Sequence, residues 1–175
     1  MRSYAGIGSR DISSKELEVI LRLSKKLSEK YICYSGNAPG ADENFEKGSE
    51  GKCVIFLPWR DFNAESYDPR NSLASFVVGN EPEGLESISK FHQNPQGLTR
   101  GGRALMARNY YQIMGYDKFP RVSFVVCCAD FNAKGSILGG TGQACRIAKS
   151  LKIPIFNIRK PGFLEDLKSF LVELG

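Results

Sequence analysis

A run of small residues stands directly ahead of a predicted helix near the end of the chain. Gly139, Gly140, Thr141 and Gly142 precede a helix expected over residues 143–151. Glycine lets the backbone approach a ligand closely, and the free N–H groups and dipole at a helix start favour negative charge. The run contains no carboxylate, and Thr141 adds a hydroxyl donor. It therefore predicts a phosphate-binding turn, although a single glycine turn is equally typical of a tight strand–helix connection.

Two further turns of this kind each follow a predicted strand. The first follows a strand that starts at Tyr4, and the second follows residues 31–34. Because the carboxyl ends of parallel strands meet at one edge of a sheet, the three turns should converge on one ligand. The candidate ligand-binding residues are Gly6, Gly8, Ser9, Arg10, Ser35, Gly36, Asn37, Asp42, Arg108, Asn109, Gly139, Gly140, Thr141, Gly142 and Gln143.

Several of these candidates have alternative roles. Asn37 and Asp42 suit ribose hydroxyls, whereas Asp42 equally suits a helix start, where its charge offsets the helix dipole. Arg10 either reaches a phosphate or lies in solvent. Arg108 either contacts anionic groups of the ligand, which the guanidinium geometry favours, or forms a salt bridge with the segment 59–102.

Predicted strands and helices alternate along the chain. The strands are expected over 4–9, 31–34, 52–58, 122–127 and 153–158, and the helices over 15–27, 41–48, 103–114, 143–151 and 163–174. Ser13 or Ser14 can cap the first helix, which carries Glu16 in its first turn. The alternation predicts a Rossmann-like, three-layer α/β fold with a mostly parallel sheet. Residues 1–175 are expected to form a single domain, in which 59–102 is a long insertion after the third strand, an irregular cover or oligomer contact.

Composition limits the classes of protein. The chain of 175 residues carries a net charge of +5, one histidine and five cysteines. The odd number of cysteines, with Cys127 and Cys128 in an apolar run, predicts reduced and buried thiols, and no cysteine or histidine spacing suits a metal. No membrane span or signal peptide is expected, which predicts a cytoplasmic protein. The charge permits a nucleic-acid partner, but the basic residues are scattered, so a solvated surface is favoured.

Several motifs, in order along most of the chain, carry a family resemblance. They are Gly6–Arg10, Ser35–Gly36 with Gly40–Asp42, Ala107–Asn109, Gly139–Gln143 and Ile153–Asn157. Together they resemble the SLOG superfamily, which groups the lonely-guy phosphoribohydrolases with the DNA-processing protein A fold, and the similarity is closest to small members encoded by bacteriophages. The resemblance implies a Rossmann-like sheet whose glycine turns bind a nucleotide or nucleotide derivative, in the host cytoplasm if the protein is encoded by a phage.

The catalytic motif of the phosphoribohydrolases is incomplete in this chain. That motif resembles PGGxGTxEE, in which a glutamate assists cleavage of the bond between base and ribose phosphate. Gly139, Gly140 and Gly142 match it, but the two glutamate positions hold Cys145 and Arg146. Arginine stays protonated, and a thiol in an apolar setting is a poor substitute for a carboxylate. No catalytic residue is therefore assigned, and the sequence favours binding without catalysis and without a required cofactor.

Three functions remain open at this point. The favoured one is a phage anti-defence protein that sequesters a host immune signal, either of the ADP-ribose type or a cyclic nucleotide. The second is a nucleotide N-glycosidase that uses an acid outside the motif, among Asp42, Glu43, Glu46 and Asp130. The third is a single-strand DNA-binding protein, which the scattered charge disfavours. Self-association into a homo-oligomer is also expected, because proteins of this fold commonly pair.

Overall fold

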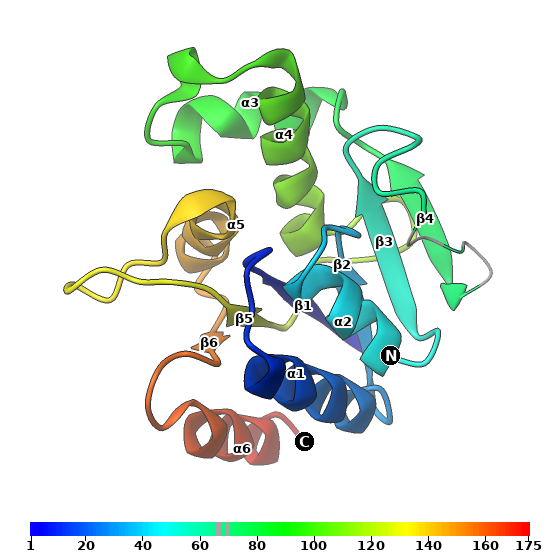
Figure 1. Ribbon diagram of the computed structural model, residues 1–175, viewed down its shortest axis with the longest axis vertical. Helices are drawn as coiled ribbons and strands as arrows, with labels where there is room; N and C mark the ends of the chain where they lie inside the picture. Colours follow the sequence, from blue (N-terminus) through cyan, green and yellow to red (C-terminus); the bar gives the residue numbers. More distant parts are fainter. Residues whose placement is uncertain (66–67, 69–70) are drawn as a thin grey trace.

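A six-stranded sheet forms the middle layer of the computed structural model, which describes residues 1–65, 68 and 71–175 (Figure 1). Its strands are β1 (Arg2–Gly8), β2 (Tyr31–Ser35), β3 (Cys53–Leu57), β4 (Ala74–Val77), β5 (Phe124–Cys128) and β6 (Ile155–Asn157). They lie in the order β4-β3-β2-β1-β5-β6, and neighbouring strands run parallel. The winding direction reverses between β1 and β5, which is where open α/β sheets bind ligands.

Helices cover both faces of this sheet (Figure 1). They are α1 (Ser14–Leu27), α2 (Ala41–Gly48), α3 (Pro82–Phe91), α4 (Arg100–Met114), α5 (Gly139–Ser150) and α6 (Phe163–Leu174). α1, α2 and α6 pack on the face that includes Tyr4 and Phe124, whereas α4 and α5 pack on the face that includes Tyr34 and Phe56, with α3 against α4. This arrangement confirms the predicted three-layer, Rossmann-like fold. No helix in the described part of the chain is long and apolar enough to cross a membrane.

Local signals account for the first helix and for the central strand β5. The Ser13 Oγ accepts a hydrogen bond from the N–H of Glu16 at 3.1 Å, and the Glu16 carboxylate accepts from the N–H of Ser13 at 2.8 Å. This capping box confirms the predicted start of α1. β5 is buried on both faces, so that Cys128 faces one core and Cys127 the other. All five cysteines are free and buried, as expected.

Residues 59–102 are more regular than the sequence indicated. They contain the edge strand β4, the helix α3 that begins at Pro82 and a 3₁₀ turn at Pro95–Gly97, and α4 already begins at Arg100. β4 has only four residues, and it is held by parallel pairing with β3. Its short apolar pattern alone does not predict a strand, because the pairing depends on another segment of the chain. Residues 66, 67, 69 and 70 lie outside the described part. The single-domain organisation and the role of this segment as a cover or oligomer contact stay predictions.

Candidate functional site

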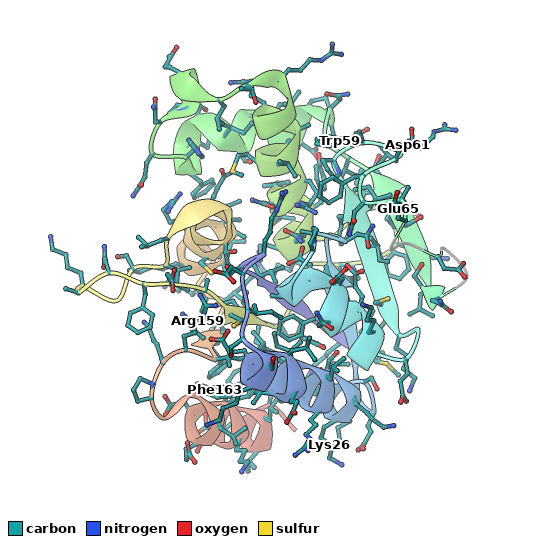
Figure 2. The ribbon with its side chains drawn as sticks, in the orientation of Figure 1. Lys26, Trp59, Asp61, Glu65, Arg159 and Phe163 are labelled. Atoms are coloured by element: carbon teal, nitrogen blue, oxygen red, sulfur yellow. The ribbon has the colours of Figure 1, made fainter. Side chains whose placement is uncertain are left out.

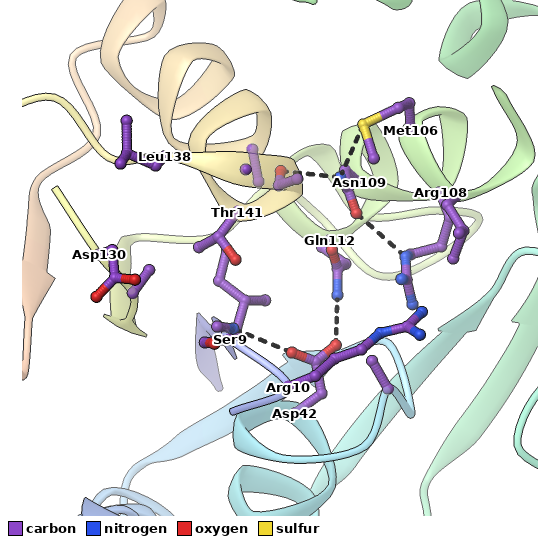
Figure 3. Close-up of a pocket in the computed structure, with 18 residues that line it drawn as sticks. Ser9, Arg10, Asp42, Met106, Arg108, Asn109, Gln112, Asp130, Leu138 and Thr141 are labelled. Carbon is purple, nitrogen blue, oxygen red and sulfur yellow. Dashed lines mark hydrogen bonds between the residues drawn. The ribbon is translucent and has the colours of Figure 1, made fainter. Parts of the chain in front are cut away.

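A pocket of about 410 Å³ lies at the carboxyl edge of the sheet, where the chain leaves the neighbouring strands β1 and β5 towards opposite faces (Figure 3). Turns after these two strands, parts of α2 and α4, and the first turn of α5 form its walls. The predicted site residues that line it are Gly8, Ser9, Arg10, Asp42, Arg108, Asn109, Gly139, Gly140 and Thr141. Residues from three separate turns and from α4 therefore meet at one pocket.

The first turn of α5 faces this pocket without a cap. The helix begins at Gly139, so the glycine-rich run is the first turn of the helix and does not precede it. The side chain of Leu138, the N-cap residue, makes no capping hydrogen bond, and the first backbone amide with an acceptor is that of Gly142, which donates to Leu138 at 3.1 Å. Among the described residues, the amides of Gly139, Gly140 and Thr141 have no acceptor. These amides and the helix dipole favour an anion.

Two arginines reach the same pocket in different ways. Arg10 is exposed, and its side chain has neither a hydrogen bond nor an ion pair with the described residues. Arg108 is buried: its guanidinium donates to the backbone carbonyls of Gly36 and Phe56 and to the Oδ1 of Asn109. Burial lowers the pKa of Arg108, and the charge of Arg10 adds to this effect, while nearby carboxylates oppose it. Both guanidiniums thus bring positive charge to the pocket.

Asp42 forms part of the polar floor of the pocket. One carboxylate oxygen accepts from the N–H of Gly8 at 3.1 Å, and the other accepts from the Nε2 of Gln112 at 3.4 Å (Figure 3). Burial raises the pKa of Asp42, and the positive charge of Arg108 opposes this rise. Both oxygens of the Asp42 carboxylate thus already accept hydrogen bonds from the protein itself.

Two side-chain amides fix the position of α5 relative to α4. The Nδ2 of Asn109 donates to the carbonyl of Gly140 at 3.1 Å, and the Nε2 of Gln143 donates to the carbonyl of Met106 at 3.2 Å. Gln143 is fully buried and does not line the pocket. Its Oε1 has no partner among the described residues. These bonds set the angle at which the first turn of α5 meets the pocket.

The remaining predicted site residues lie away from the pocket lining. Gly6 lets Phe45 pack on the sheet, because a Cβ at Gly6 would lie 2.6 Å from that ring. The Ser35 hydroxyl donates to the Gly6 carbonyl at 2.6 Å, and Asn37 anchors the loop after β3 through its side-chain amide. Gly36 and Gly142 pack against Arg108 and the Ile137 carbonyl, respectively.

Nine lining residues were not among the candidate ligand-binding residues, including Leu105, Met106, Gln112, Leu138 and Asp130, the last of which was a candidate only as an acid for the enzyme alternative. Two of them carried a usable signal. Gln112 stands one helical turn after Arg108, and Asp130 follows closely after β5, at the carboxyl edge. Leu105, Met106 and Leu138 had none, since apolar residues beside or within a helix usually indicate the core.

The candidate acids Asp130 and Glu46 each have a partner within the described part of the chain. Asp130 at the rim is exposed and pairs with Arg159 at 2.9 Å. Glu46 does not line the pocket, and its carboxylate accepts from the Asn37 N–H at 2.6 Å. Cys145 and Arg146 stand where the hydrolase motif has its two glutamates. Cys145 is buried, the Arg146 Nε donates to the Phe91 carbonyl, and neither residue lines the pocket. The described residues contain no cluster of three histidine, cysteine or acidic side chains that could hold a metal.

Comparisons with known proteins bear on the fold. A scan against protein-family models finds no match, and a search of curated proteins finds none either. Among solved structures, DNA processing protein A from Helicobacter pylori, described for its single-stranded DNA binding mode, is 15% identical with a TM-score of 0.59, and the match covers 95% of this chain and 72% of that one. DNA processing protein A from Streptococcus pneumoniae is 16% identical with a TM-score of 0.54, covering 100% of this chain and 57% of that one. These likenesses show the same Rossmann-like fold.

The comparisons correct the function that the sequence favours. The expectation of a phage protein that sequesters a nucleotide-derived signal is wrong, because the two solved structures named above are both DNA processing protein A, and one of them is described for its single-stranded DNA binding. Because the basic residues are scattered along the sequence, we gave the single-strand DNA alternative too little weight. Arg10 and Arg108 are far apart in the sequence but line one pocket, and backbone amides attract an anion without any basic run. Phage origin and self-association stay predictions.

Proposed function

We propose that this protein binds single-stranded DNA and that the pocket at the start of α5 holds a backbone phosphate. The observation that carries the proposal is the meeting, at one pocket, of the uncapped first turn of α5 and the guanidinium of Arg10, which has no partner in the described part of the chain. Amides without acceptors and a cation without a counter-charge both gain hydrogen bonds when an anion binds.

The charges around the pocket also favour an anion over a neutral ligand. Arg10 and Arg108 both bring positive charge to the pocket, and because Arg10 is exposed, water screens part of their mutual repulsion. Asp42 offsets part of this charge, but its two oxygens already accept from Gly8 and Gln112. A phosphate bound near both guanidiniums would reduce the repulsion, and this gain adds to the hydrogen bonds from α5.

The walls of the pocket suit a nucleotide unit better than an inorganic anion. Leu105, Met106 and Leu138 place partly exposed apolar side chains beside the polar groups. Such surfaces fit the carbon atoms of a sugar or base. The flexible backbone of a single strand can bend so that one phosphate and its sugar enter a concave site. A duplex cannot do this, because its backbone lies on the outside of a convex cylinder. The solved structure described for single-stranded DNA binding shares the fold over 95% of this chain, which supports the same ligand class here.

Fluorescence anisotropy with a labelled oligothymidylate tests this proposal, because that strand has no secondary structure of its own. The protein should bind it about tenfold more tightly than a duplex of equal length, a difference of about 1.4 kcal/mol. Affinity should fall as salt rises, with a log–log slope of about −0.7 for each phosphate neutralised. Equal affinity for the duplex, or no binding at low salt, would contradict the proposal.

A further inference from the structure

Trp59 is an exposed aromatic residue at the same edge of the sheet as the pocket. It is the only tryptophan of the chain, and 41% of its surface is exposed. β3 ends at Leu57, and the strands run parallel, so the loop that carries Trp59 leaves the carboxyl edge next to α4 (Figure 2). A large aromatic ring is therefore left partly in solvent at the edge where this fold binds ligands.

The indole of Trp59 is held from two sides. Phe62 packs edge-on against it, with 5.1 Å between the ring centroids and 88° between the ring planes. The first turn of α4 borders it as well, since a Cβ at Gly101 would lie 3.9 Å from the indole. The Asn37 Nδ2 donates to the Phe62 carbonyl at 3.1 Å, and the Asn63 Nδ2 donates back to the Asn37 carbonyl at 2.9 Å. The ring is thus positioned before any ligand binds, which lowers the entropy lost on binding.

Two contacts connect Trp59 with the pocket. Phe62 touches Trp59 on one side, and on the other it lies under the guanidinium of Arg108, whose Cζ is 5.5 Å from the Phe62 ring centroid. Arg108 in turn lines the pocket. Trp59 and the pocket are therefore linked through two buried side chains, Phe62 and Arg108.

Exposed arginines lie on the two segments next to the ring. Arg60 follows Trp59 in the loop, and Arg100 and Arg103 lie in the first turn of α4, where a Cβ at Gly101 would come within 3.9 Å of the indole. Asp61 and Glu65 supply negative charge on the same loop, so the local charge is mixed. Aromatic rings that stack on bases, combined with cations that contact the backbone, are the usual means of holding a single strand.

We propose that Trp59 stacks on a base of the same strand whose phosphate occupies the pocket. The inference rests on the proposed function and adds a second contact to it. Every base has a π face, so this contact would raise affinity without selecting a sequence. A strand held at both places would follow the carboxyl edge of the sheet from the start of α5, past Arg108, to the loop after β3.

Fluorescence of Trp59 gives a direct test, because a single tryptophan reports its own surroundings without any substitution. Titration with unlabelled oligothymidylate should quench its emission with the same midpoint as the anisotropy titration. Trp59→Leu keeps apolar bulk over Phe62 but has no ring, and it should bind about tenfold more weakly. Trp59→Phe keeps a ring and should stay within about threefold of the wild type. Thermal unfolding of both variants checks that they fold.

The outcomes separate this inference from the proposed function. Quenching together with a weaker Trp59→Leu variant supports the stacking site. If the wild type binds in a salt-dependent way but its emission is unchanged and Trp59→Leu binds equally well, stacking is refuted while single-strand binding stands. If the wild type binds no single strand, both proposals are refuted.

Discussion

The side-chain amide of Asn109 donates to the carbonyl oxygen of Gly140 at 3.1 Å, so α4 holds the first turn of α5 by its backbone. A second bond, from Gln143 to the Met106 carbonyl, fixes the same two helices one turn further along. The Gly140 and Met106 carbonyls make this connection, whereas the amides of Gly139, Gly140 and Thr141 have no acceptor among the described residues. The structure thus anchors α5 without occupying its anion-binding groups.

Gly140→Val should weaken the binding of single-stranded DNA about tenfold, because the branched side chain would hinder a phosphate from reaching the amides. The fold should survive, since a Cβ at this position meets only the flexible Met106 Cε at 3.1 Å and the Asn109 Nδ2 at 3.8 Å. Anisotropy measures the affinity. Ser150→Val, at the exposed end of the same helix, is the control. Wild-type affinity in a folded Gly140→Val variant would show that the phosphate binds elsewhere.

Glu46 should make stability depend on pH. Burial, with a further contribution from the charge of Asp42, raises the pKa of Glu46 to about 8 from an ordinary value of 4.5. Between these two values the folded protein keeps a proton that the unfolded chain has lost, so the free energy of unfolding should fall as pH rises through this window.

Glu46→Gln tests this dependence, because glutamine still accepts from the Asn37 N–H but cannot ionise. The variant should be more stable than the wild type by roughly 1–3 kcal/mol at pH 8, and the difference should shrink towards pH 5. Urea unfolding across this range measures it. Parallel stability profiles for the two proteins would be inconsistent with a buried, neutral Glu46.

Asn37→Ala should lower the free energy of unfolding by about 1–3 kcal/mol. The substitution removes donors to the Phe62 and Asn63 carbonyls, and alanine tolerates the backbone φ of +53° poorly. Asn37→Gly loses the same bonds but accepts that φ, so it separates the two effects. The emission maximum of Trp59 should shift in both variants as its loop loosens. Unfolding midpoints and emission spectra like those of the wild type would rule out Asn37 as an anchor.

Features that depend on neighbouring residues were predictable from the sequence. The capping pair of Ser13 and Glu16 marks the start of α1, and the alternation of apolar strands and amphipathic helices indicates the parallel, three-layer fold. The glycine run at Gly139 also indicates a helix start, although it lies within the helix. Each of these signals depends on residues close together in the sequence, and the same local structures are present in the fold.

Features that depend on distant contacts were not predictable. Gly36 and Asn37 were candidates for ligand binding, but the Gly36 carbonyl accepts from Arg108 and the Asn37 amide holds the loop of Phe62. A turn rich in polar and small residues looks the same in sequence whether its groups face a ligand or another segment. β4 was missed for a related reason, since its partner strand decides its conformation.

The salt dependence of single-strand binding in Arg10→Ala tests the central claim most directly. Arg10 lines the pocket without a partner among the described residues. Arg22, an exposed arginine on α1, provides the control, because its substitution removes the same charge elsewhere. Arg10→Ala should bind oligothymidylate about tenfold more weakly, with a log–log salt slope smaller by about 0.7, and Arg22→Ala should match the wild type. Equal affinities and slopes for all three proteins would contradict a phosphate site at this pocket.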